Sequence, residues 1–325
     1  MLESIIKDIN QSIDITNIEK FSSKLKNFIF SYKKNKKKLA FVTDFDFTIS
    51  KKYNYQKNLL LGSSYKFFDE SLIGGDQEKF LKTQNELCNQ YMKYETDTSF
   101  DIKIREKKMK EFYAKSLDIY IKPNFTRDSI GKMLEKLKDK FELRKYTKEL
   151  FNILIKLEIP IIIVSGGIQE VIIDLLKKIM PDFQLYCKLK KIVIIANELF
   201  FDEEKGCIGH SNDVIYTFNK SSFVKTVINA YFPDIENILI MGDHLNDYDS
   251  VKDLNLTQDN IIGFGFVNIK PELIGKETKK KEIQNTVNDF EQVYDVNFIG
   301  DTDFLFMIKI LELFEDESKK KLTLL

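Results

Sequence analysis

The chain has 325 residues, and its 50 basic and 50 acidic side chains leave a formal net charge of zero. This balance provides no overall field that would attract a nucleic acid polymer or a membrane surface, so we expect neither as a partner. Hydrophobic residues make up 43% of the chain and aromatic residues 13%, which indicates a packed globular protein rather than a disordered one.

The same features predict a soluble, cytoplasmic protein. Residues 1–8 include acidic side chains and no long apolar stretch, so we expect no signal peptide. No apolar run approaches the ~20 residues that are needed to span a bilayer. Cys88, Cys187 and Cys207 are scattered and offer neither a disulfide framework nor a metal-binding pair, which fits a reducing compartment. We further expect a monomer.

The first 140 residues divide into three parts. Residues 1–32 carry apolar side chains at helical spacing, which predicts two amphipathic helices packed on a core, followed by a solvated lysine-rich loop at 33–38. Residues 39–43 are apolar throughout and predict a short buried strand. Residues 51–140 are punctuated by glycines at 62, 74 and 75 and then become charge-dense with a helical period. We expect no apolar, β-branched strand in this third part.

After residue 144, helices and strands alternate. We predict helices over 145–157, 168–180, 220–231, 247–254 and 303–314, and strands over 159–164, 191–196, 237–241, 260–267 and 295–299. Continuous apolar strands that alternate with helices predict a parallel α/β sheet covered on both faces. Because the strand at 39–43 must join this sheet, residues 51–140 are an insertion, interpreted as a helical cap over the C-terminal edge of the sheet. The predicted domains are a core of residues 1–50 and 141–325 and a cap of residues 51–140.

Two pairs of aspartates follow predicted strands. Asp44 and Asp46 come directly after the strand at 39–43, and Asp243 and Asp247 come directly after the strand at 237–241. Open α/β sheets bind ligands at the carboxyl ends of their strands, so we expect these side chains to share one crevice. Carboxylate oxygens are the ligands that Mg²⁺ prefers. The two pairs therefore predict a site for a hard cation and a phosphate.

Two further strand-end features fit a phosphate. Ser165 is followed by Gly166 and Gly167, and a hydroxyl with glycine N–H groups at the start of a helix can hold an oxyanion, although Ser165 could equally be a plain N-cap. Lys220 opens another predicted helix, where a lysine opposes the helix dipole; this unusual placement suggests a partner, although most lysines in such positions are merely exposed. Attack by a carboxylate on a phosphate dianion brings like charges together, so a divalent cation and a lysine suit that reaction.

The order of these four motifs resembles the haloacid dehalogenase (HAD) superfamily of phosphohydrolases. The resemblance implies a doubly wound, Rossmann-like core with a mainly helical cap inserted after the first strand. It implies that Asp44 is the nucleophile, that Asp46 is the general acid and base, and that Thr48 steadies the loop between them. The phosphoryl group would be bound by Ser165, Gly166, Lys220 and Thr48. The cofactor Mg²⁺ would be held by Asp44, the backbone carbonyl of Asp46, Asp243 and Asp247, the last of which could instead orient Lys220.

Residues 43–50, 160–168, 197–202, 214–220 and 240–243 are similar, more narrowly, to the cytosolic pyrimidine 5′-nucleotidases of type III. In that family the helical cap recognises the nucleobase. The resemblance implies that Glu95 hydrogen-bonds the base and that Phe112 and Ser116 contact it. This sequence departs from the family's usual pattern at three positions, with Phe112 in place of Trp, Gly166 in place of Ala and His244 in place of Ser.

The resulting hypothesis is a Mg²⁺-dependent 5′-nucleotidase that hydrolyses pyrimidine nucleoside 5′-monophosphates through an aspartyl-phosphate. Two alternatives stay open: a HAD phosphatase for another small phosphomonoester such as phosphoserine, and a catalytically idle binding protein on the same fold. Retention of all the motif residues argues against the idle protein. We expect His244 to be a hydrogen-bonding loop residue and His210 to lie exposed in a turn.

Overall fold

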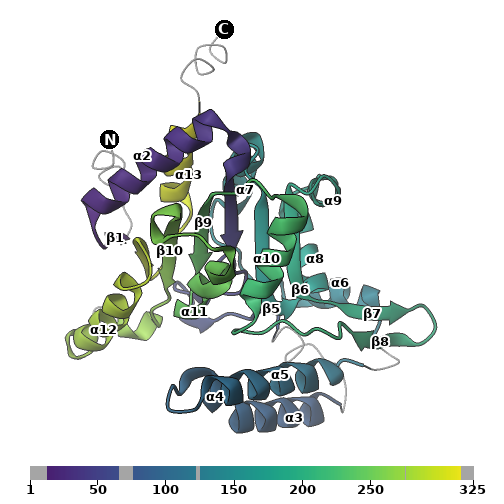
Figure 1. The fold of residues 1–325 in the computed structure, drawn as a ribbon. Helices are drawn as coiled ribbons and strands as arrows, with labels where there is room; N and C mark the ends of the chain where they lie inside the picture. Colours follow the sequence, from purple (N-terminus) through teal and green to yellow (C-terminus); the bar gives the residue numbers. More distant parts are fainter. Residues whose placement is uncertain (1–12, 66–75, 122–124, 275, 316–325) are drawn as a thin grey trace.

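A seven-stranded sheet lies at the centre of the part of the chain that this computed structural model describes, residues 13–65, 76–121, 125–274 and 276–315 (Figure 1). Its strands, in spatial order, are β1 (Ile13–Ile15), β11 (Val296–Ile299), β10 (Ile261–Val267), β9 (Asn237–Gly242), β2 (Leu39–Thr43), β5 (Ile161–Ile168) and β6 (Ile192–Asn197). All neighbouring pairs are parallel except β1 with β11. The central strand β2 is therefore flanked by β9 and β5, whose carboxyl ends meet its own.

Helices cover both faces of the sheet because apolar side chains alternate between the two faces along each strand. Phe41 packs in one cluster with side chains of α2 (Ile18–Lys34), α7 (Thr147–Lys156), α8 (Gln169–Ile179) and α13 (Leu305–Leu311). Its neighbour Val42 packs on the other face with Val224 and Ile228 of α10 (Lys220–Tyr231). Figure 1 shows α10 in front of the sheet and α8 behind it. This double covering is the predicted α/β architecture.

Smaller elements complete the core. Helix α11 (Leu245–Tyr248) and the 3-10 helix η4 (Asp249–Leu254) follow β9, while α9 (Phe183–Lys188) precedes β6 and α12 (Lys280–Glu291) packs beside β10 and β11. Strands β7 (Leu199–Asp202) and β8 (Gly206–His210) form a separate hairpin. The remaining 3-10 turns are η1 (Lys36–Lys38), η3 (Lys138–Lys140), η5 (Gln258–Asn260), η6 (Pro271–Leu273), η7 (Glu277–Lys279) and η8 (Glu312–Phe314). None of the described helices is both long enough and apolar enough to cross a membrane.

The segment inserted between β2 and α7 is mainly helical. It contains α3 (Asp76–Tyr91), α4 (Lys93–Thr96), α5 (Ile102–Asp118) and α6 (Arg127–Lys136), preceded by a small hairpin of β3 (Tyr53–Asn54) and β4 (Leu59–Leu60). Helices α3, α4 and α5 lie beyond the carboxyl ends of the sheet strands (Figure 1). We call α3–α6 the cap helices; the division of the chain into domains at residues 50 and 140 stays a prediction.

Several local predictions were wrong. Ile13, expected in a helix, lies in β1, and the rest of that expected helix falls outside the described residues. The lysine-rich segment at 33–38 is partly helical, since α2 runs through Lys34 and η1 follows. The β3–β4 hairpin lies where no strand was expected. The α9 and α12 helices and the β7–β8 hairpin were not predicted. His210, expected in a turn, is the last residue of β8. Its Nε2 atom lies 3.2 Å from Asp118 Oδ1 of α5.

Candidate active site

A buried lysine joins two of the predicted aspartates. The Lys220 ammonium, at the first residue of α10, lies 2.7 Å from Asp44 Oδ1 and 2.7 Å from Asp247 Oδ1. Asp44 follows β2, and Asp247 lies on α11, just after β9. All three side chains are less than a tenth exposed. The lysine at this helix N-terminus therefore has two acidic partners.

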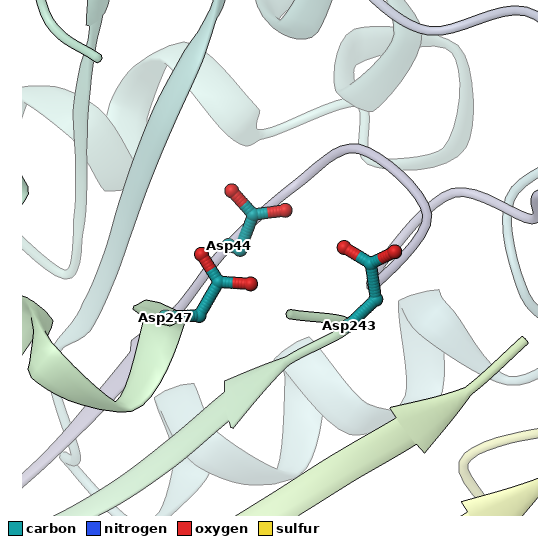
Figure 2. Close-up of side chains that lie close together, drawn as sticks. All are labelled: Asp44, Asp243 and Asp247. Atoms are coloured by element: carbon teal, nitrogen blue, oxygen red, sulfur yellow. The ribbon is translucent and has the colours of Figure 1, made fainter. Parts of the chain in front are cut away.

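Asp243 completes a cluster of three carboxylates. Asp44, Asp243 and Asp247 each offer one oxygen, and these three oxygens all lie within 4.8 Å of one another. Figure 2 shows the three carboxyl groups pointing to the same side of the strand ends. Three hard anionic oxygen donors at this spacing fit a divalent cation such as Mg²⁺. The fourth predicted ligand is the backbone carbonyl of Asp46, and its part in metal binding stays a prediction.

The local fold explains why these residues meet. Strands β2 and β9 are parallel neighbours with Thr43 opposite Met241, and the Asp44 N–H donates to the Met241 carbonyl at 3.1 Å. Asp247 turns back toward them because its Oδ2 accepts the His244 N–H at 3.0 Å, while His244 Nδ1 accepts the Asn246 N–H at 3.3 Å. His244 is thus the N-cap of α11.

Burial and the like charges of neighbouring carboxylates disfavour the ionised form of the aspartates in this cluster. Burial raises the pKa of Asp44 well above its usual value, and the charges of Asp247 and Asp243 add to that rise, while Lys220 opposes it. Burial, followed by the charge of Asp247, raises the pKa of Asp243 to about 6. Burial alone would lower the pKa of Lys220, but the charges of Asp247 and Asp44 outweigh it and the pKa rises. The lysine therefore stays charged, and the carboxylates favour further positive charge.

Asp46 occupies a separate position and is held by a residue that the sequence did not single out. The Ser64 N–H donates to Asp46 Oδ1 and the Ser64 hydroxyl donates to Oδ2, both at 2.6 Å. Burial raises the pKa of Asp46, and the Ser64 hydrogen bonds oppose that rise. A Cβ at Gly167 would lie 1.8 Å from Ser64 Oγ and 2.9 Å from Asp46 Oδ2, so only glycine fits there. A carboxyl with a raised pKa and a fixed orientation suits proton transfer.

The loop from Asp46 to Thr48 is clamped by a buried arginine. Phe47 has a left-handed backbone with a φ of 65°, and its carbonyl accepts from Arg144 Nη2 at 2.9 Å and from Asn268 Nδ2 at 3.0 Å. Arg144 Nε also donates to the Thr48 carbonyl at 2.8 Å. The Thr48 hydroxyl is buried and has no hydrogen-bond partner among the described residues. The hydrogen bonds from Arg144 and Asn268 thus stabilise the left-handed backbone of Phe47, which is unfavourable for a residue other than glycine.

The segment at 165–167 belongs to β5 rather than to the start of a helix. Helix α8 begins at Gln169 with Ile168 as its N-cap, so neither the helix-start prediction nor the N-cap alternative for Ser165 was correct. Ser165 is buried, and its Oγ accepts the Gly167 N–H at 3.0 Å, which leaves the hydroxyl proton for another acceptor. A Cβ at Gly166 would lie 2.9 Å from Cε1 of Tyr113, so this glycine lets a tyrosine of α5 reach the sheet.

The three residues proposed to contact a base lie on the cap helices. Glu95, on α4, accepts a hydrogen bond from the Thr217 hydroxyl. Phe112 and Ser116 lie on α5, where Phe112 is buried among aromatic rings and the fully buried Ser116 hydroxyl has no hydrogen-bond partner within the described part of the chain. Phe112 is a member of an aromatic group, with ring centroids 6.0 Å away in Tyr65, 6.0 Å away in Tyr91 and 5.4 Å away in Tyr113. Tyr65, Tyr113 and Thr217 were given no role from the sequence.

Tyr113 connects the cap to the strand-end cluster. Burial raises its pKa well above the usual value, the charge of Glu95 adds to this rise and the charge of Lys220 opposes it. Both groups are therefore within electrostatic range of the same phenol. The predicted base-binding carboxylate and the predicted phosphate-binding lysine thus face one shared region between the cap and the sheet.

The parallel sheet, with acidic residues beyond β2 and β9 and a helical segment over their ends, is the fold of HAD-like phosphohydrolases. The sequence profile of the pyrimidine 5′-nucleotidase (UMPH-1) family matches residues 47–314. The chain belongs to this family, and it is accordingly a 5′-nucleotidase, a phosphoric monoester hydrolase. This membership decides against the phosphoserine and idle-protein alternatives as the class of the protein.

Individual relatives agree with the family. The chain is 29% identical over 273 residues to 7-methylguanosine phosphate-specific 5′-nucleotidase A of Xenopus laevis, covering 81% of this chain and 83% of that one. It is 28% identical over 239 residues to the human 7-methylguanosine phosphate-specific 5′-nucleotidase, covering 72% and 75%. The crystal structure of cytosolic 5′-nucleotidase IIIB bound to cytidine superposes with a TM-score of 0.77 at 20% identity, covering 99% of each chain, which shows a shared fold.

Proposed function

We propose that the protein is a Mg²⁺-dependent 5′-nucleotidase that hydrolyses nucleoside 5′-monophosphates, with a preference for pyrimidine bases. The observation that carries the proposal is Lys220 bridging Asp44 and Asp247 beside the third carboxylate, Asp243. A nucleophilic carboxylate, a fixed cation and oxygen ligands for a metal are what phosphoryl transfer to an aspartate requires. The name of the structural neighbour, a cytosolic 5′-nucleotidase, supports a cytoplasmic location as part of this proposal.

In the first step, a carboxylate oxygen of Asp44 attacks phosphorus, the bond between phosphorus and O5′ breaks, and an aspartyl-phosphate forms. Asp46 donates its carboxyl proton to O5′, so the nucleoside leaves as a neutral alcohol. The raised pKa of Asp46, caused first by burial, supports this role because it favours the protonated carboxyl. Ser165 and Lys220 would bind the phosphoryl oxygens.

In the second step, the Asp46 carboxylate accepts a proton from a water molecule whose oxygen attacks phosphorus. The bond between phosphorus and Asp44 then breaks, which releases inorganic phosphate and restores the free carboxylate. When a divalent cation is bound by Asp44, Asp243 and Asp247, its charge reduces the repulsion between the nucleophile and the phosphate dianion. The Ser64 hydrogen bonds support both steps because they orient the same Asp46 carboxyl for donating and for accepting the proton.

The base would bind between the cap helices and the sheet. Glu95 offers carboxylate oxygens to the hydrogen-bond donors of a base, and Ser116 offers a buried hydroxyl that lacks a partner among the described residues. The rings of Tyr65 and Tyr113, whose centroids lie 5.3 Å apart, supply aromatic surface for stacking. A second candidate base is 7-methylguanine, because the curated relatives from Xenopus and human are named for that nucleotide.

Phosphate release from a substrate panel tests the proposal. The panel contains CMP, UMP, AMP, GMP, 7-methyl-GMP, phosphoserine and p-nitrophenyl phosphate, each with and without Mg²⁺, and Asp44→Asn serves as the blank. We expect Mg²⁺-dependent turnover of CMP and UMP above the other compounds. Preferential turnover of 7-methyl-GMP would keep the nucleotidase and replace the base preference. Turnover of the non-nucleotides alone, or no release above the blank, would contradict the proposal.

A further inference from the structure

Thr217 makes the contact between the candidate base-binding carboxylate and the sheet. It lies in the segment that leads into α10, three positions before Lys220, and its hydroxyl donates to Glu95 Oε1 on α4. The two residues are 122 positions apart in the chain, so this hydrogen bond joins the cap to the core. Thr217 lies in the 214–220 segment that resembles the family, but the sequence assigned it no role.

The direction of the hydrogen bond between Thr217 and Glu95 follows from the protons that each side chain carries. A threonine hydroxyl has one proton, and an ionised glutamate can only accept, so that proton goes to Glu95. The hydrogen bond uses Oε1 of Glu95, so Oε2 of the same carboxylate can accept from a ligand.

The backbone of Glu95 is fixed to the same segment of the core. Arg105 of α5 donates from Nη2 to the Glu95 carbonyl at 2.7 Å and from Nε to the Tyr94 carbonyl at 3.0 Å. Its guanidinium lies 4.8 Å from the ring centroid of Phe218, the neighbour of Thr217. Arg105 therefore holds the main chain of Glu95 near Phe218, and Thr217 holds its carboxylate.

We propose that Thr217 is a specificity-determining positioning residue, which orients the Glu95 carboxylate so that one oxygen accepts hydrogen bonds from the base of the nucleotide. This inference rests on the base-binding role given to Glu95 in the proposed function. Without the hydroxyl, the carboxylate can rotate, and a nucleotide must order it on binding. The defect should therefore appear in nucleotide binding and not in the chemistry at Asp44.

Steady-state kinetics of Thr217→Val and Thr217→Ser test the proposal, with CMP or 7-methyl-GMP, whichever the wild type prefers, and with p-nitrophenyl phosphate, which has no base. Thr217→Val should raise the KM for the nucleotide about tenfold with little change in kcat, since one hydrogen bond to a charged group is lost. Its kinetics on p-nitrophenyl phosphate should match the wild type, and Thr217→Ser should restore the nucleotide KM. Thr226→Val is the matched control, because its hydroxyl donates to the Ser222 carbonyl on the exposed side of α10.

A double-mutant cycle with Glu95→Ala tests whether Thr217 acts by orienting the Glu95 carboxylate or only by attaching the cap helices to the core. If Thr217 acts through Glu95, adding Thr217→Val to Glu95→Ala should leave the nucleotide KM unchanged. Additive effects, an equal loss on p-nitrophenyl phosphate, or no effect of Thr217→Val would each overturn the inference while leaving the proposed nucleotidase intact. Failure of the wild type to favour any nucleotide over p-nitrophenyl phosphate would instead refute the proposed function, and this inference with it.

Discussion

Replacing Lys220 by methionine tests the central ion cluster. Methionine matches the length of the side chain but removes the ammonium that lies 2.7 Å from both Asp44 and Asp247. Three carboxylate oxygens within 4.8 Å of one another then lose the one cation that bonds two of them. Removing one partner from a buried ion pair costs about 3–5 kcal/mol. In a chain of this size that corresponds to a fall in Tm of roughly 4–7 °C.

The variant Lys24→Met provides a matched control. Lys24 is also buried, and its ammonium lies 2.8 Å from Asp295 Oδ1 and 2.9 Å from the Ile261 carbonyl, away from the strand-end carboxylates. It should lower the Tm by a similar amount and leave the activity of the folded protein unchanged. Lys220→Met should also lower kcat/KM by about 10³-fold on every phosphomonoester, because the transferring phosphoryl group loses the positive charge that would stabilise it in the transition state.

Thermal unfolding at pH 8 with and without Mg²⁺, together with phosphate release, measures both effects. A bound divalent cation replaces the lost positive charge, so Mg²⁺ should raise the Tm of Lys220→Met by more than it raises that of the wild type. Lys24→Met should show the wild-type Mg²⁺ response. An unchanged Tm for Lys220→Met, or an equal Mg²⁺ response in all three proteins, would refute the view that this lysine balances the carboxylate cluster.

Three further predictions concern neighbouring groups. Gly167→Ala should lower kcat by roughly 10²-fold with a small change in KM, because its Cβ would displace Ser64 from Asp46; wild-type kcat would contradict this. Asp243→Asn should raise the Mg²⁺ concentration for half-maximal activity at least about tenfold, and an unchanged metal titration would remove Asp243 from the metal site. Burial raises the pKa of Glu170 to about 7 from a usual value of 4.5, so the folded state binds the proton more tightly and stability falls as pH rises through this range, by roughly 3 kcal/mol. Glu170→Gln should therefore be more stable than the wild type at pH 8 but not at pH 4, and an equal difference at both would contradict the assignment.

The strands and the motif residues could be predicted because their signals are local. A run such as residues 39–42 is apolar at every position, which predicts a strand buried on both faces. Asp44 and Asp247 were predicted to lie together because each follows a strand and the parallel sheet brings strand ends to one edge, whereas the place of Lys220 beside them was implied by the family resemblance. The prediction of the site thus depended on both the topology and the resemblance.

The supporting residues could not be predicted because their partners are distant in the chain. Ser64 bonds Asp46 from 18 positions away, Arg144 bonds Thr48 from 96 positions away, and Thr217 bonds Glu95 from 122 positions away. A single serine, arginine or threonine carries no pattern of its own. The same holds for β1 and the β3–β4 hairpin, whose strands of two or three residues are too short for an alternation to register.

These distant contacts make the inserted segment part of the candidate active site. Ser64 donates a hydrogen bond to Asp46, Tyr113 packs against Gly166 beside Ser165, and Glu95 accepts a hydrogen bond from Thr217, three positions before Lys220. Each of these three residues comes from the insertion, and each contacts a catalytic motif or the segment that leads into one. Any movement that lifts the cap helices from the sheet would break the second and third contacts, and it would break the first if Ser64 moved with them. In the proposed mechanism, recognition of the base and orientation of the Asp46 carboxyl therefore both depend on residues of the inserted segment.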